Sequence, residues 1–262
     1  MEPQLRHAVA DGVATVVIDH PAKRNAMTSD MWRALPPLLG ALAADPAVRA
    51  LVLTGAGDTF CAGADISSLR TEPGRAQELA GRAEEALAVF PKPTLAAVRG
   101  YCVGGGCQLA AACDLRFADE DATFAITPAK LGIVYAASTT RRLVALVGPA
   151  TAKYLLFSGE PIDAARALRG GLVDEVLAAG ELDARVKEFT RVLASRSLLT
   201  QAAAKEFASD VATGGAGSGT GDFGAAREAY WAGQMRDSGD TAEGVAAFLE
   251  RRQPRFTWTP PR

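Results

Sequence analysis

Apolar positions in the first half of the chain follow two alternating patterns. Short runs rich in Val, Leu and Ala occupy residues 13–19, 49–54 and 93–98, and they predict strands, the last two covered on both faces. Helical spacing of apolar residues predicts a helix after Thr28 and a second one over 75–90. We expect Pro36 and Pro37 to kink or divide the first helix.

The second half of the chain is predicted to be mainly helical. After short apolar runs at 114–117 and 123–126, helices are expected near 138–147, 149–158 and 163–168, with one late strand at 172–176. From residue 182 onward only helical patterns remain, and the run Gly214 to Gly224 predicts a flexible loop between them. We therefore expect an α/β core over residues 1–197 and a helical region over 198–262 that suits oligomerisation.

Composition and charge exclude several classes of function. The 262 residues carry 28 Lys and Arg against 30 Asp and Glu, a balance that disfavours nucleic acid as a partner. The sequence contains no apolar stretch of the roughly 20 residues that span a bilayer, and it begins without the layout of a signal peptide. We therefore expect a cytoplasmic protein with no membrane partner. Its four cysteines lack C-x-x-C spacing, and with only two histidines no metal site is expected.

Two glycine-bearing segments follow predicted strands, at residues 55–66 and 100–109. The triplet Gly104 to Gly106 opens a helix of small residues, so backbone N–H groups at that helix start are free to bind a negative group. A G-x-G-x-x-G dinucleotide motif fails because Leu109 stands at its last position, and no phosphate loop of the Gly-Lys-Ser/Thr kind follows. Taken alone, the triplet is explained more readily by close packing of a strand on a helix.

The two segments together suggest more specific chemistry. A thioester carbonyl that gains negative charge during reaction needs two converging N–H donors among small residues, and the runs 62–64 and 104–106 offer two such places. Motifs along nearly the whole chain carry a resemblance: HPAKRNAM at 20–27, FCAGADI at 60–66, PKPTLAAVRGYCVGGGC at 91–107, CDL at 113–115, LG at 131–132, ALRGGLV at 167–173 and FLERRQPRF at 248–256. With these motifs the sequence resembles the enoyl-CoA hydratase/isomerase (crotonase) superfamily.

The resemblance implies a spiral of ββα units, a helical C-terminal trimerisation region, and an acyl-CoA substrate without a further cofactor. It places the oxyanion donors on the N–H groups of Ala64 and Gly105, and the adenine and pantetheine contacts on the backbone of residues 62–66, which includes Ala62, Asp65 and Ile66. Lys23 or Arg24, and the Arg251-Arg252 pair of a neighbouring subunit, are candidates for the CoA phosphates, although they are equally consistent with solvated surface charge. A homotrimer, or a hexamer built from two trimers, is expected. The side chains of Asp65 and Asp114 are interpreted as structural.

The acidic residues that hydratases of this family use are absent at the matching positions. Gln108 and Ala129 stand where the two catalytic glutamates would be, and Ala136 stands where some isomerases carry an acid. An amide does not titrate near neutral pH and alanine has no proton to give. Hydration by two carboxylates is therefore not expected.

Tyr135 suggests another reaction. The stretch 124–135 resembles the methylmalonyl-CoA decarboxylase branch of the superfamily, in which a tyrosine orients the substrate carboxylate; here Val134 replaces the proline before it, and Ala64 replaces a histidine. Decarboxylation forms an enolate directly and needs no carboxylate base. Three hypotheses stay open: decarboxylation of a malonyl-CoA-type thioester with Gln108 and Tyr135 at the site, hydratase or isomerase activity with atypical residues, and acyl-CoA binding without catalysis.

Overall fold

The computed structural model describes residues 2–67, 73–213 and 222–260. A six-stranded sheet runs through it in the order β1-β2-β3-β4-β6-β9. Its strands are β1 Gln4–Ala10, β2 Val13–Asp19, β3 Ala50–Gly55, β4 Thr94–Val98, β6 Leu115–Asp119 and β9 Glu175–Leu177. Only β1 pairs antiparallel, with β2; the other neighbours are parallel. Every residue of β4 is buried, as expected for a parallel strand covered on both faces.

A second sheet of three short strands lies beside the first. It consists of β5 Tyr101–Val103, β7 Thr123–Ala125 and β8 Ile162–Asp163, in the order β5-β7-β8. Because β4 and β5 are separated by only two residues, the chain passes directly from the large sheet to the small one at Arg99 and Gly100. This step brings the second glycine segment next to the first, as described below.

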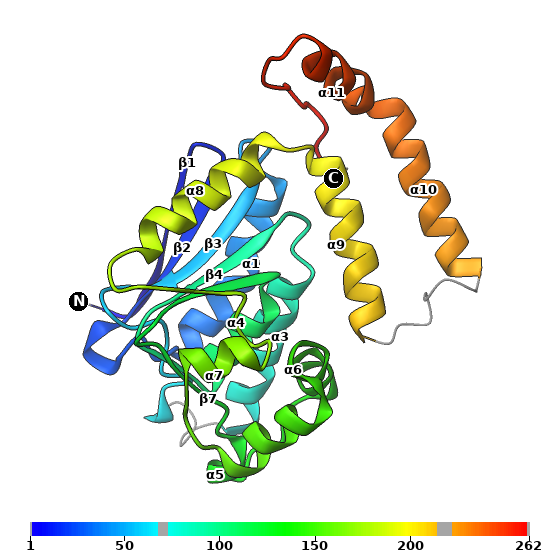
Figure 1. Cartoon of the computed structure of the whole chain (residues 1–262). Helices are drawn as coiled ribbons and strands as arrows, with labels where there is room; N and C mark the ends of the chain where they lie inside the picture. Colours follow the sequence, from blue (N-terminus) through cyan, green and yellow to red (C-terminus); the bar gives the residue numbers. More distant parts are fainter. Residues whose placement is uncertain (1, 68–72, 214–221, 261–262) are drawn as a thin grey trace.

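Helices cover both faces of the large sheet (Figure 1). Helix α8 (Leu182–Ser195) lies on one face, where Leu182 and Val186 pack with Val52, Leu95 and Phe117. On the other side are α1 (Ser29–Ala44), α3 (Pro73–Ala88) and the short α4 (Gly105–Ala112). Further helical segments that the structure describes in this body are η1 Pro21–Lys23, α5 Pro128–Leu131, α6 Ala137–Ser158 and α7 Ala164–Arg169.

Helix α1 is not divided at its two prolines. It runs from Ser29 to Ala44 with Pro36 and Pro37 inside, so of the two expected outcomes, a kink or a division, the division was wrong. Pro36 is half-buried and Pro37 is exposed, and the residues that hold the helix in place lie on its other face. Those buried residues are Met31, Trp32, Leu35, Leu39 and Leu42. Packing of this apolar face outweighs the loss of backbone hydrogen bonds at the prolines.

Other predicted elements are confirmed with shifted ends. The break expected between residues 147 and 149 is present, because Gly148 in the middle of α6 has a positive φ of 73°. The late strand is β9 at Glu175–Leu177 rather than residues 172–176. Leu172 and Val173 are buried there, but the carbonyl of Leu172 accepts a hydrogen bond from the Arg116 side chain instead of joining the sheet. Strands β1, β5 and β8 were not predicted.

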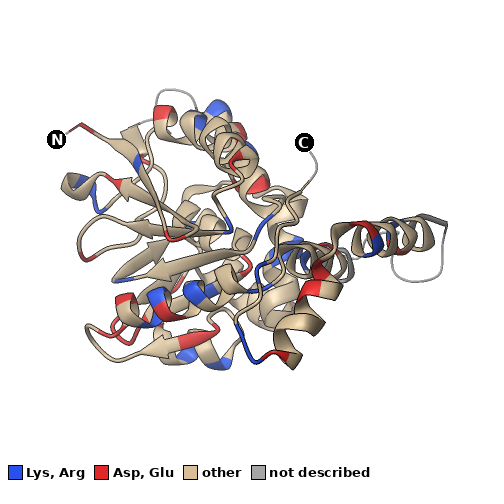
Figure 2. Ribbon diagram, turned by 90° about the horizontal axis from the view of Figure 1, so that it is seen from above, with Lys and Arg blue, Asp and Glu red and all other residues tan. Residues whose placement is uncertain are grey.

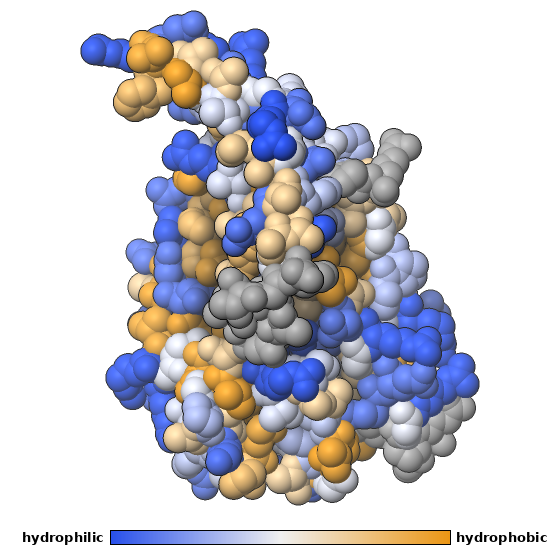
Figure 3. Space-filling model, turned by 90° about the vertical axis from the view of Figure 1, so that its right-hand side faces the viewer, coloured by the Kyte–Doolittle hydropathy of each residue, from blue (hydrophilic) through white to orange (hydrophobic). Residues whose placement is uncertain are grey.

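The C-terminal region consists of α9 Leu198–Thr213, α10 Asp222–Ser238 and α11 Asp240–Leu249, which extend away from the α/β body as an arm (Figure 1). The loop predicted at 214–224 lies outside the described residues over 214–221, while residues 222–224 begin α10. Trp258 folds back onto α9 and α10, where it packs with Leu198, Leu199 and Trp231. Apolar residues remain exposed on this arm, among them Phe248 at 83% and Leu249 at 74% (Figure 3).

Charged residues of both signs are mixed over the molecule. Figure 2 shows Lys and Arg interspersed with Asp and Glu along the helices. Among the residues that the structure describes, no helix is long and apolar enough to cross a membrane.

Candidate functional site

The two glycine segments lie backbone to backbone. Cys61 forms a parallel bridge with Cys102, in which its N–H donates to the carbonyl of Tyr101 and its carbonyl accepts from Val103. A methyl group at Gly106 would lie 2.3 Å from the Cys61 carbonyl oxygen, and one at Gly63 would lie 2.9 Å from that of Val103. Gly63 also has a positive φ of 100°. Glycine is therefore required at both positions, because any side chain would push the two segments apart.

This contact leaves two N–H groups without partners at one place. The backbone of Met27 forms a parallel bridge with Ala64, in which its N–H donates to Gly63 and its carbonyl accepts from Asp65. The N–H of Ala64 therefore points to the opposite side, away from Met27. Gly105 begins α4, and its N–H lies at the open start of that helix. Neither N–H donates a hydrogen bond within the described part of the chain. The nitrogen of Ala64 lies 3.5 Å from the point where a Cβ of Gly105 would stand, so the two donors are close enough to share one acceptor.

The residues predicted to contact CoA surround the first segment, at the rim of this site. Lys23 forms an ion pair with Asp65 at 2.7 Å, and Asp65 also accepts bonds from the N–H and hydroxyl of Ser67. Burial raises the pKa of Asp65, but the hydrogen bonds from Lys23 and Ser67 outweigh it, so the pKa lies below its ordinary value. The Asp65 side chain thus holds the turn in shape, and Lys23, with 49% of its side chain exposed, still faces solvent.

The other rim residues differ in their surroundings. The Arg24 guanidinium lies 4.7 Å above the centre of the Tyr101 ring, while the Arg24 carbonyl accepts the N–H of Ala62. Ile66 is 68% exposed, which is unusual for an isoleucine. Arg252 pairs with Glu243 and Glu250 within the C-terminal region. A site shared with a neighbouring subunit stays a prediction, as does binding of CoA at Lys23 and Arg24.

Next to the free N–H of Gly105, the structure brings Gln108 and Tyr135 together around a small cavity. Gln108 is on α4 and is 7% exposed, and the Tyr135 hydroxyl lies 3.9 Å from the point where a Cβ of Gly104 would stand. The cavity measures about 10 Å³, about the room of one water molecule. Its lining consists of Gly104, Cys107, Gln108, Ala111, Ile126, Tyr135, Thr139, Thr140, Leu143 and Leu156.

The polar groups of this cavity are uncharged. Burial raises the pKa of Tyr135 above its ordinary value, and the nearby Cys107 and Glu84 raise it further, so the phenol stays protonated at neutral pH. Ala129 and Ala136 are exposed and are absent from the lining. Lys130 is absent as well, since its side chain packs toward Gly159. The cavity wall therefore offers hydroxyl and amide groups rather than a carboxylate.

One carboxylate that sequence reasoning missed lies directly behind this wall. Glu84 on α3 is 2% exposed and accepts a hydrogen bond of 2.5 Å from the hydroxyl of Thr139, which lines the cavity. It also forms an ion pair with Arg142. The sequence could have predicted that Glu84 is buried, because it falls on the same face of the helix as the buried Ala76, Ala80 and Leu87. An acid on an otherwise apolar stripe is expected to be paired.

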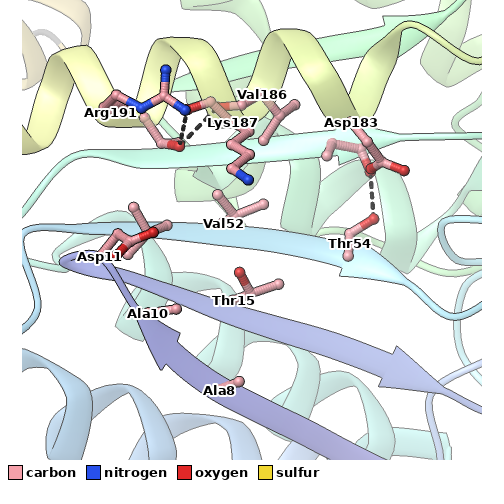
Figure 4. Close-up of a pocket in the computed structure, with 13 residues that line it drawn as sticks. Ala8, Ala10, Asp11, Thr15, Val52, Thr54, Asp183, Val186, Lys187 and Arg191 are labelled. Carbon is pink, nitrogen blue, oxygen red and sulfur yellow. Dashed lines mark hydrogen bonds between the residues drawn. The ribbon is translucent and has the colours of Figure 1, made fainter.

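A larger cavity of about 650 Å³ lies elsewhere, between the sheet and α8 (Figure 4). Small side chains such as Ala8, Thr15 and Thr54 line the sheet side, and Lys187 and Arg191 come from α8. None of its lining residues belongs to the glycine segments. The size of a cavity therefore does not identify the site. The small cavity is the candidate, because it lies beside the two free N–H groups and has polar side chains in its wall.

Comparisons with known proteins give the family of the chain. The family model for enoyl-CoA hydratase/isomerase matches residues 8–259. The short-chain-enoyl-CoA hydratase of Clostridium acetobutylicum is 35% identical over 251 residues, 92% of each chain. The crotonyl-CoA hydratase of Syntrophomonas wolfei is 35% identical over 93% of this chain and 94% of its own. A crystal structure of an enoyl-CoA hydratase/isomerase family member superposes with a TM-score of 0.88 at 40% identity, covering 99% of this chain and 100% of that one. The chain therefore belongs to the enoyl-CoA hydratase/isomerase family, with the crotonase fold.

Proposed function

We propose that this enzyme decarboxylates a malonyl-CoA-type thioester. The N–H groups of Ala64 and Gly105 would bind the thioester oxygen, and Gln108 and Tyr135 would orient the carboxylate on the α-carbon. In this step the bond between the α-carbon and the carboxylate breaks, its electron pair forms the enolate, and carbon dioxide leaves. The enolate oxygen then carries the charge that the two N–H groups stabilise, an interaction that is stronger in the transition state than in the bound substrate.

The observation that carries the proposal is the uncharged polar lining of the cavity. Gln108 can donate a hydrogen bond from its amide and Tyr135 from its hydroxyl. These donors would hold the substrate carboxylate without a positive charge, which would stabilise the carboxylate and oppose its loss. Decarboxylation needs no base at this position. With room for about one water, the cavity accepts a carboxylate only if the segment carrying Tyr135 moves outward. Val134, just before Tyr135, is 86% exposed, whereas Tyr135 itself packs against the core, so the movement would have to break those contacts.

Hydration of an enoyl-CoA is the second candidate. It is favoured by the names of the relatives from Clostridium acetobutylicum and Syntrophomonas wolfei, both hydratases. In this reaction the Gln108 amide would hold the attacking water within the cavity, which has about its size. Because an amide cannot remove a proton from that water, we expect crotonyl-CoA hydration only at a trace rate.

The CoA thioester is the substrate and no further cofactor is proposed. CoA would bind along residues 62–66, with its phosphates near Lys23 and Arg24. Exposed apolar side chains on the C-terminal helices, such as Val245 and Phe248, support assembly with further copies of the chain as a trimer or hexamer. We also propose that the enzyme works in the cytoplasm, where its four unpaired cysteines would stay reduced.

The test is to incubate the protein with methylmalonyl-CoA and ethylmalonyl-CoA and to measure carbon dioxide release, with crotonyl-CoA hydration assayed in parallel. We expect decarboxylation by the unaltered protein, and a loss of about tenfold or more in kcat for Tyr135→Phe. Hydration at a rate typical of an enzyme with two glutamates would replace the proposal with the second candidate. Micromolar binding of acyl-CoA without turnover of any thioester would instead favour a binding protein.

A further inference from the structure

The proposed reaction leaves an enolate whose α-carbon must receive a proton. At the three positions where the family resemblance places an acid, this chain carries Gln108, Ala129 and Ala136. Of the groups lining the cavity, Tyr135 holds its proton firmly, because burial raises its pKa. A carboxyl group connected to the cavity is a stronger acid than this phenol and is the better source of the proton.

Glu84 is the buried carboxylate with a direct connection to the cavity. It is 2% exposed on α3, and the Thr139 hydroxyl on α6 donates to it at 2.5 Å. Thr139 is itself 7% exposed and lines the cavity together with Gln108 and Tyr135. The Thr139 hydroxyl thus lies between the Glu84 carboxylate and the cavity. In the proposed reaction the substituent on the α-carbon enters the cavity and does not touch Glu84.

We propose that Glu84 stores the α-carbon proton and delivers it through the hydroxyl of Thr139. In the structure the Thr139 hydroxyl donates to Glu84; once Glu84 is protonated, its carboxyl donates to Thr139 Oγ1 instead and the hydroxyl proton turns toward the cavity. In the delivery step Thr139 gives this proton to the α-carbon, and the electron pair of the enolate forms the new C–H bond. At the same time the protonated carboxyl of Glu84 gives its proton to the oxygen of Thr139. Glu84 becomes a carboxylate paired with Arg142, and water returns one proton to it before the next cycle. Thr139 is the group that meets the substrate, and Glu84 acts through it.

The surroundings of Glu84 suit both protonation states. Burial raises its pKa above the ordinary value, while the bonds from Thr139 and Arg142 lower it in part, and the neighbouring Glu85 raises it. The other titratable group that acts on this site is Tyr135, across the cavity wall. Because burial raises its pKa, this carboxyl holds a proton more readily than an exposed glutamate does, as a group that stores a proton requires.

This inference rests on the proposed enolate chemistry but can be tested apart from decarboxylation. The same relay run backwards removes an α-proton from a simple acyl-CoA. We therefore propose measuring deuterium uptake at the α-carbon of propionyl-CoA in D₂O by NMR. The unaltered protein is expected to catalyse the exchange, and Glu84→Gln and Thr139→Val are expected to slow it by about a hundredfold.

Two further variants separate a relay from a structural role. Thr139→Ser keeps a hydroxyl at the same place and is expected to retain most of the exchange. Glu78→Gln is the matched control, because Glu78 lies on the same helix as Glu84 but is exposed and pairs with Arg82 rather than with Thr139 or Arg142. Circular dichroism and the melting temperature of each variant check folding. If Glu84→Gln does not fold, the Thr139 pair still decides the question.

The outcomes distinguish the relay from the proposed function. Exchange without decarboxylation of any malonyl thioester would reject the proposed reaction and keep the relay. Exchange by Glu84→Gln at the unaltered rate would overturn the relay, as would equal losses in Thr139→Ser and Thr139→Val. Absence of exchange in the unaltered protein would overturn it as well.

Discussion

The ring of Trp32 lies against Gly105, so that a methyl group at Gly105 would meet Cζ2 of the indole at 3.0 Å. Trp32 is 1% exposed and comes from α1, far in sequence from the second glycine segment. The contact places a rigid wall behind the N–H that we assign to the oxyanion site. It also explains why Gly105 cannot carry a side chain without moving either the ring or the donor.

Gly105→Ala is expected to reduce thioester turnover by about 100-fold or more, because the methyl group displaces one of two donors in the oxyanion site. The measurement is kcat for decarboxylation or for α-proton exchange. Gly81→Ala serves as the control, because Gly81 lies inside α3 and a Cβ added there would meet no atom within 4 Å. That change should leave turnover unaltered and should stabilise the helix by up to about 1 kcal/mol. Equal losses in both variants would contradict the assignment.

Arg116→Met is expected to destabilise the fold by about 3 kcal/mol or more. The Arg116 side chain is 2% exposed and binds the carbonyls of Cys113 and Leu172 as well as the carboxylate of Asp174. Its removal leaves the two carbonyls without this donor, while Asp174 keeps the hydrogen bond from the backbone N–H of residue 116. Urea unfolding measures the change, and Arg82→Met, which breaks only an exposed pair with Glu78, should stay within about 1 kcal/mol. A small effect at Arg116 would mean that water replaces its bonds.

The turn at Asp65 should lose stability in acid. Since the folded-state pKa of Asp65 lies below its ordinary value of 3.8, its contribution is complete above that pH and disappears as the pH falls through the folded pKa. We expect Asp65→Asn to be less stable than the unaltered protein at pH 7 and nearly equal to it at the lowest pH at which both fold. Urea unfolding over this range checks the prediction, with exposed Asp121→Asn as the control. A difference that does not change with pH would contradict it.

The four cysteines should not react in the folded protein. All four are buried and unpaired, and burial raises the pKa of Cys61 and of Cys113 to about 12. Because the thiolate is the reactive form, a disulfide reagent at pH 7.5 is expected to modify none of them until denaturant is added, and then all four. Rapid modification of any thiol without denaturant would show that the glycine segments around Cys61 and Cys107 open readily.

The sequence predicted those features that depend on the residue at a single position or on a short run of residues. Gly63 needs its positive φ, and Gly106 must admit the Cys61 carbonyl at close range; residues of this kind cannot be exchanged, so they stand out as a motif. The buried parallel strands β3 and β4 were equally visible, because both faces require apolar side chains. Strand β1 was missed, since most of its residues are exposed and its pattern carries little apolar signal.

The sequence by itself determined the family, the oxyanion donors proposed at Ala64 and Gly105, and the lack of acids at positions 108, 129 and 136. Only the tertiary structure decided which groups surround the cavity. Glu84 and Thr139 lie 55 residues apart, and no local pattern specifies that α3 and α6 bring them together. Packing of those helices closes the wall and places a carboxylate behind it, in a position that the motifs do not mark.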